Sequence, residues 1–217
     1  MNKYIIFDLD GTILNTLRDL TNSVNFALKS FDFPERSIEE INGFVGNGIK
    51  KLVQLSVPDN TTEEITDKVY NVFNLHYSKH LNDFTKPYDG VKDLLLNLKN
   101  NGKKLAVVSN KPHLAVVELC DIHFKGYFEV VTGKQDKFKK KPSPDAVYYV
   151  MSEMNADKNC TVFIGDSEVD IKTAQNADIP CVSVSWGFRS AEQLKNAGAN
   201  TIISDTVDLQ RFLLSEK

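Results

Sequence analysis

Residues 4–12 read Tyr-Ile-Ile-Phe-Asp-Leu-Asp-Gly-Thr, an apolar run that stops at two aspartates and a glycine. Short apolar runs bounded by turn signals are typical of buried strands, and Asp-Gly favours a turn. This stretch therefore predicts a strand over residues 4–7. The carboxyl end of that strand carries Asp8 and Asp10 into a loop.

Beyond Pro87 and Gly90 the pattern alternates between short apolar runs and amphipathic stretches. We predict strands at 105–108, 128–132, 161–164, 181–185 and 201–203, and helices at 91–98, 113–122, 144–154, 169–177, 190–197 and 207–214. Strands that alternate with helices form right-handed βαβ units and a parallel sheet. The sequence therefore predicts an α/β fold with a Rossmann-like parallel core, to which strand 4–7 also belongs.

The block between these two parts has only helical signals. Apolar residues recur at spacings of three and four at Leu17, Leu20, Val24, Leu28 and Phe31, and we expect capping boxes at Ser37 with Glu40 and at Thr61 with Glu64. We predict an inserted all-α domain over residues 17–82 in a core domain of residues 1–16 and 83–217. Two connections near 13–17 and 83–89 then form a hinge.

Composition narrows the class of protein. The chain has 217 residues, 41% hydrophobic and 25% charged, with a net charge of −3. These values are typical of a globular protein, and the negative balance argues against nucleic-acid binding. No apolar run approaches the length of a membrane span, and the three cysteines show no metal or disulfide spacing. We expect a cytoplasmic protein with no membrane or nucleic-acid partner; its oligomeric state stays open.

Polar residues follow several of the predicted strands. They are Asp8, Asp10, Gly11 and Thr12 after the first, Ser109, Asn110 and Lys111 after the second, and Asp166 and Asp170 after the fourth, with Lys141 in a loop after the third. Ligands of an open α/β sheet bind beyond the carboxyl ends of its strands. Carboxylates, a hydroxyl and an ammonium at one edge suit phosphoryl transfer, in which Mg²⁺ and Lys offset the charge of the phosphate.

Four motifs carry a family resemblance. They are DLDGT at 8–12, Ser109-Asn110, KPSP at 141–144 and GDSEVD at 165–170. In this order they resemble the motifs of the haloacid dehalogenase (HAD) superfamily of phosphatases, and the helical insertion resembles that superfamily's cap domain. The resemblance spans nearly the whole chain.

The resemblance implies a role for each matching position. Asp8 is the nucleophile that forms an aspartyl-phosphate, and Asp10 is the acid and base. Phosphate is bound by Gly11, Thr12, Ser109, Asn110 and Lys141. Mg²⁺ is held by Asp8, the carbonyl of Asp10 and Asp166, with Asp170 behind or joined through water. An aspartate two residues after the nucleophile favours a phosphatase or phosphomutase over a dehalogenase, because an alkoxide leaving group needs an acid.

The inserted domain is expected to select the substrate. Gly46-Asn47-Gly48 lies between two predicted helices and resembles a stretch in the cap of phosphoglycolate phosphatases. Free backbone N–H groups before a helix favour a small anion, with added charge from Lys50 and Lys51. Arg189, after the fifth strand, is a candidate for the entrance to the site.

These observations predict a Mg²⁺-dependent phosphomonoesterase that acts on a small phosphorylated metabolite, 2-phosphoglycolate by preference. The alternatives are a sugar phosphomutase (β-phosphoglucomutase-like) or a pyrophosphatase of the same superfamily, and a non-catalytic phosphate-binding module. In the basic run Lys134–Lys141 several lysines fit the third motif. We choose Lys141 because Pro142 follows it.

Overall fold

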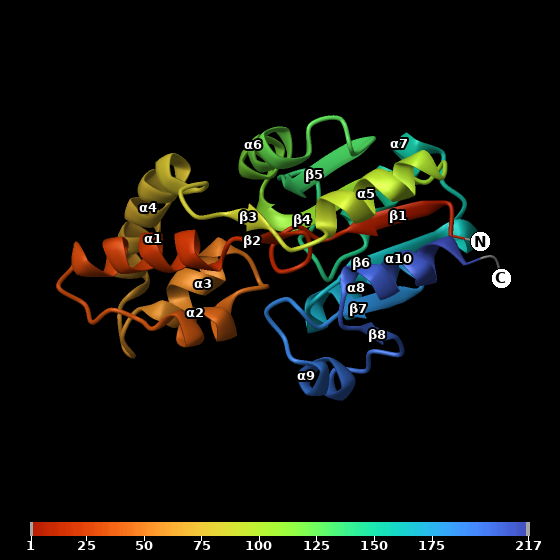
Figure 1. Cartoon of the computed structure of the whole chain (residues 1–217). Coiled ribbons are helices and arrows are strands. Elements are labelled where there is room, and N and C mark those ends of the chain that lie inside the picture. The colour runs from red at the N-terminus through yellow and green to blue at the C-terminus, as the bar shows by residue number, and fades with distance from the viewer. Residues whose placement is uncertain (1, 216–217) are drawn as a thin grey trace. The chain divides into compact units, whose positions relative to one another are not determined.

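A computed structural model describes residues 2–215 of the protein. Six parallel strands form one sheet in the order β5-β4-β1-β6-β7-β8 (Figure 1). The strands are β1 Tyr4–Phe7, β4 Lys104–Pro112, β5 Val130–Lys134, β6 Thr161–Gly165, β7 Cys181–Val184 and β8 Ile202–Ile203. The chain fills one side of β1 with β4 and β5 before it returns to the other side with β6. This reversal of strand order makes β1 and β6 the topological switch point, where ligands of such sheets bind.

Helices cover both faces of this sheet. They are α5 Val91–Asn100, α6 His113–Phe124, α7 Asp145–Met154, α8 Glu168–Ala177, α9 Ala191–Asn196 and α10 Thr206–Leu214, with a 3₁₀ turn η1 at Lys158–Cys160. Helices α7 and α8 share a hydrophobic cluster with Tyr4, Ile6 and Phe163. The alternate residues of β1, Ile5 and Phe7, are also fully buried. Burial on both faces explains why the strands read as unbroken apolar runs.

The remaining helices form a separate group. They are α1 Leu17–Lys29, α2 Ile38–Phe44, α3 Ile49–Ser56 and α4 Glu63–His80. Their packing is helix on helix, with α1 against α4, α2 and α3. The capping box at Ser37 and Glu40 is confirmed, with both of its hydrogen bonds formed. The one expected at Thr61 is wrong: Thr62 caps α4, and the Thr61 hydroxyl donates to the carbonyl of Pro58 instead.

By its internal contacts the chain divides into two compact units. A core unit comprises Met1–Leu14 and Pro87–Lys217, and a helical unit comprises Asn15–Lys86. Two short strands, β2 Leu14–Asn15 and β3 Lys86–Pro87, pair where the chain passes between the units. The sequence predicts no strand in either connection, because two-residue strands leave no periodicity to detect.

Within the helical unit a buried carboxylate fixes the second connection. Asp19 of α1 is 1% exposed and accepts hydrogen bonds from the N–H groups of Phe84 and Thr85 and from the Thr85 hydroxyl. The Arg18 guanidinium lies 3.7 Å from the centre of the Phe84 ring.

Among residues 2–215 no helix combines the length and apolar character needed to cross a membrane.

Candidate active site

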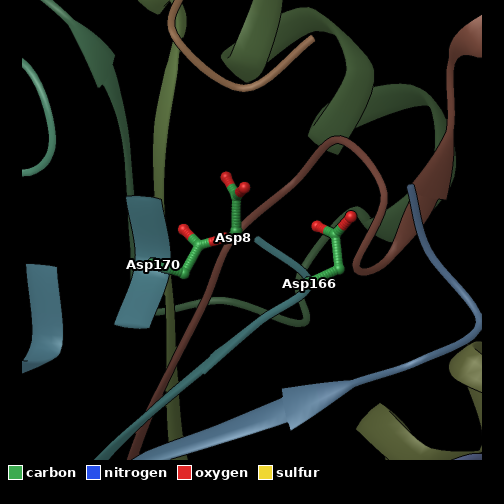
Figure 2. A group of neighbouring side chains, drawn as sticks. All are labelled: Asp8, Asp166 and Asp170. Atoms are coloured by element: carbon green, nitrogen blue, oxygen red, sulfur yellow. The ribbon is translucent and has the colours of Figure 1, made fainter. Parts of the chain in front are cut away.

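The site begins at the carboxyl ends of two adjacent strands. β1 and β6 pair in register, and Asp8 continues the ladder by donating its N–H to the carbonyl of Ile164 at 2.9 Å. This pairing brings Asp8 beside Asp166, which follows β6. With Asp170 they form a buried cluster in which one oxygen of each carboxylate lies within 4.8 Å of the others. Figure 2 shows the three side chains pointing to the same side.

The Lys141 ammonium neutralises part of this cluster. Its Nζ lies 2.6 Å from Oδ1 of Asp170 and 3.0 Å from Oδ1 of Asp8. Burial alone would lower the pKa of Lys141, but the charges of Asp170 and Asp8 outweigh burial and raise it. Lys141 therefore stays charged. Of the lysines in the 134–141 run, Lys141 is the one that the structure pairs with Asp8.

Confinement raises the pKa values of the buried carboxyl groups. Burial raises the pKa of Asp8 to about 7, with further increases from the charges of Asp170 and Asp10 and an opposing effect from Lys141. Burial, followed by the charges of Asp170 and Asp8, also raises the pKa of Asp166. Desolvation and like charge both disfavour the ionised form.

The first loop and the loop after β7 enclose Asp166. The Thr12 hydroxyl donates to its Oδ1 at 3.0 Å, and the Phe188 N–H donates to its Oδ2 at 2.8 Å. The indole N–H of Trp186 donates to the carbonyl of Thr12. A Cβ at Gly11, where φ is +85°, would lie 2.3 Å from Oδ2 of Asp166. Both Asp166 oxygens are thereby oriented, and Gly11 permits the close approach.

Asp170 is held by its own helix. It is the third residue of α8 and accepts from the N–H and hydroxyl of Ser167 at 3.1 and 2.5 Å, which completes a capping box. The cap and the Lys141 contact use different oxygens of Asp170. A helix N-terminus also favours negative charge.

The end of β4 contains a bulge that carries three consecutive polar side chains. β4 advances from Val108 to Pro112 while β5 advances only from Thr132 to Lys134, so Ser109–Lys111 form a bulge. Bulges re-aim side chains beside active sites. Ser109 is buried, and Asn110 bonds the backbone of Lys141 twice, accepting from its N–H at 2.8 Å and donating to its carbonyl at 3.1 Å. Lys111 forms an ion pair with Asp10 at 2.8 Å.

The core unit thus brings together the site residues expected there, with some different partners. Thr12 donates to Asp166, the Gly11 N–H donates to the carbonyl of Leu14, and Asn110 braces Lys141. Sequence reasoning placed Lys111 in the polar cluster after the second strand but gave it no role. The only signal was its place directly after Ser109-Asn110, because the bulge that turns it toward Asp10 leaves no pattern.

The structure also places the Gly46–Gly48 segment, Lys50 and Arg189. Gly46, Asn47 and Gly48 lie in the helical unit, where both glycines have positive φ and Gly48 is the N-cap of α3. Lys50 pairs with Asp67 at 2.9 Å. Arg189 is mostly buried, and its Nε donates to Glu168 at 3.0 Å.

Comparisons with known proteins agree with this geometry. The profile of the haloacid dehalogenase-like hydrolases matches residues 5–184. Phosphoglycolate phosphatase 1 of Pseudomonas aeruginosa is 31% identical over 213 residues, which cover 95% of this chain and 78% of the relative. A solved structure from Lactobacillus delbrueckii subsp. bulgaricus has a TM-score of 0.95 and 34% identity, covering 99% of both chains. A predicted phosphoglycolate phosphatase from Haemophilus somnus has a TM-score of 0.89 and 30% identity, covering 97% of both.

Proposed function

The chain belongs to the haloacid dehalogenase-like hydrolases, and from this premise we propose that it is a Mg²⁺-dependent phosphomonoesterase for a small phosphorylated metabolite, 2-phosphoglycolate. The observation that carries the proposal is that Asp8 and Asp10 have different charged partners. Asp8 faces a cluster of carboxylates and Lys141, whereas Asp10 is paired separately with Lys111. A nucleophile and an acid need different surroundings.

The residues fit a divalent cation. Asp8, Asp10, Asp166 and Asp170 outnumber the ammonium groups of Lys111 and Lys141 by two when all are ionised. Mg²⁺ prefers oxygen ligands and is bound by few carboxylates together with a phosphate. Asp8 and Asp166 would hold it, with Asp170 behind them. When bound, the ion neutralises phosphoryl charge and keeps the buried carboxylates ionised.

The proposed reaction uses Asp8 and Asp10 in turn. An Asp8 oxygen attacks phosphorus, the bond from phosphorus to the ester oxygen breaks with its electron pair on that oxygen, and Asp10 supplies the proton. Water then attacks the phosphorus of the aspartyl-phosphate and passes a proton to Asp10. The bond to Asp8 breaks, which releases phosphate and restores both groups. Lys141 and the Ser109 hydroxyl bind the phosphoryl oxygens.

We assign substrate selection to the helical unit, acting as a cap. Support comes from the segment between α2 and α3, where glycines at positive φ precede the first turn of α3. The N–H groups at the start of a helix suit a carboxylate. The names of the relatives support phosphoglycolate in particular, since the Pseudomonas aeruginosa protein is a phosphoglycolate phosphatase.

The decisive experiment measures phosphate release with Mg²⁺ from 2-phosphoglycolate, several sugar phosphates, pyrophosphate and p-nitrophenyl phosphate. We expect a preference for 2-phosphoglycolate that Asp8→Asn abolishes. Activity lost in Asp8→Asn but spread over many esters would overturn the named substrate. Activity that needs a sugar bisphosphate and releases no net phosphate would favour a phosphomutase. Binding without turnover would overturn catalysis itself.

A further inference from the structure

We propose that Lys111 is a positioning residue that fixes the carboxyl group of Asp10 for proton transfer to and from the substrate. This inference rests on the proposed phosphatase reaction and adds a residue to it. Lys111 Nζ lies 2.8 Å from Oδ1 of Asp10. The two residues are far apart in sequence and meet because β4 lies beside β1 in the sheet.

Burial separates the roles of the two side chains. The side chain of Lys111 is 1% exposed, whereas that of Asp10 is 15% exposed. The ammonium therefore holds the carboxyl group from the protein interior, while part of the Asp10 side chain remains exposed. A buried ammonium is strongly disfavoured without an anionic partner. The pair is consequently a fixed element and not a loose surface contact.

The backbone around Lys111 is equally constrained. Its N–H donates to the Ser109 hydroxyl at 3.3 Å. Its carbonyl oxygen would lie 2.4 Å from a Cβ at Gly133, so β5 packs directly against it. The bulge in β4 thus sets the direction from which the ammonium reaches Asp10. Small errors in the placement of an acid are costly to a reaction, because proton transfer requires hydrogen-bond geometry.

The alternative role for Lys111 is direct contact with the phosphate, as for Lys141. Its partner argues against that role: the Lys111 ammonium pairs with Asp10, whereas the Lys141 ammonium pairs with Asp8 and Asp170. The two roles differ in kinetics: loss of a phosphate contact weakens all esters alike. Loss of acid placement harms only esters whose leaving oxygen needs a proton. An alkyl phosphate needs one, whereas p-nitrophenyl phosphate leaves as a stabilised anion.

The test compares kcat/KM for 2-phosphoglycolate and p-nitrophenyl phosphate, with glycerol 3-phosphate as alkyl ester should 2-phosphoglycolate not be turned over. In this covalent mechanism kcat/KM reports the steps up to transfer onto Asp8. We expect Lys111→Met to lower the alkyl-to-aryl ratio about 10- to 100-fold, a part of what general acids contribute. Lys111→Arg, which keeps the charge, should recover most of the ratio.

The matched control is Lys103→Met, which removes another buried lysine just before β4, at the end opposite the site. It should leave the ratio unchanged. If Lys111→Met does not fold, as judged by thermal unfolding, Lys111→Gln replaces it and should lower the ratio in the same direction. A ratio within threefold of wild type, with or without an equal loss on both esters, overturns the role of Lys111. Lack of turnover by the wild type overturns the proposed function, and this inference with it.

Discussion

Ser109, Asn110 and Lys111 are consecutive residues that serve different parts of the site. Ser109 lies buried at the end of β4, Asn110 holds the backbone of Lys141, and Lys111 holds Asp10. The amide nitrogen and the amide oxygen of Asn110 both bond the backbone of Lys141. Asn110 therefore fixes the segment that carries the Lys141 ammonium.

Asn110→Ala tests this at the scale of one residue. The change leaves a buried N–H and a buried carbonyl of Lys141 without these partners, and each such loss costs about 1–3 kcal/mol. We expect the unfolding free energy to fall by about 2 kcal/mol and kcat to fall as Lys141 loses its fixed position. Denaturant unfolding and steady-state kinetics measure the two effects.

Asn176→Ala is the control for this prediction. The Asn176 amide donates to the carbonyl of the neighbouring Pro142, but from an exposed position. It should change both quantities little, since water replaces an exposed partner. Equal effects of the two substitutions would contradict the role given to Asn110.

At the scale of elements, the sequence predicts the regular strands and helices but not the local irregularities, such as the bulge in β4. Alternating apolar runs marked the sheet because strands buried on both faces have a strong signal. The expected strand 128–132 is β5 at Val130–Lys134, and the expected strand 105–108 extends to Pro112 in β4. The extension contains the bulge that carries the site. Asp8 and Asp166 of the candidate site were predictable because each directly follows a strand, whereas the Lys111–Asp10 pair depends on strand order and a local irregularity.

The loop after β7 is a second irregular element, and Gly187 is its tightest point. A Cβ there would lie 2.2 Å from the carbonyl oxygen of Gly11 and 2.5 Å from Cβ and Oδ2 of Asp166. Neither the backbone nor the hydrogen-bonded carboxylate can move without an energetic cost. We therefore expect Gly187→Ala to displace Asp166 from its position. We expect the Mg²⁺ concentration for half-maximal activity to rise about 10-fold or more, within the range seen when groups that orient metal ligands are lost.

Gly43→Ala provides the comparison for Gly187→Ala. A Cβ at Gly43 meets nothing within 4 Å, and the residue lies in α2, where alanine is the better helix former. This variant should keep the Mg²⁺ dependence of the wild type. An unchanged Mg²⁺ requirement in Gly187→Ala would refute the packing argument.

At the scale of the whole molecule, the proposed function assigns chemistry to one unit and selectivity to the other. The aspartates and lysines of the site lie in the core unit, and the Gly46–Gly48 segment lies in the helical unit. A cap that closes over substrate excludes bulk water and adds contacts to its non-reacting part. Selectivity can then change without loss of the underlying chemistry.

Asn47→Ala tests the division between the units. The substitution should lower kcat/KM for 2-phosphoglycolate about 10-fold, since one lost polar contact is worth about 1.4 kcal/mol. It should change kcat/KM for p-nitrophenyl phosphate little, because an aryl ester has no carboxylate for the segment to bind. Parallel losses on both esters would remove the Gly46–Gly48 segment from substrate recognition.

The excess negative charge of the candidate site makes the stability of the core unit depend on pH and Mg²⁺ in a linked way. Burial raises the pKa of Asp8 from 3.8 to about 7. Without the ion, this carboxyl group therefore destabilises the fold as pH rises from about 4 through 7, because the unfolded chain releases its proton first. Mg²⁺ binds the ionised form, so its stabilising effect should grow over the same pH interval.

At a Mg²⁺ concentration 100 times the dissociation constant, binding of the ion stabilises the fold by about 2.7 kcal/mol, or roughly 5–10 °C in Tm. Thermal unfolding at pH 5 and pH 8, with Mg²⁺ and with chelator, measures both trends. In Asp166→Asn the Mg²⁺ increment should disappear, and an increment of equal size at both pH values would contradict the linkage.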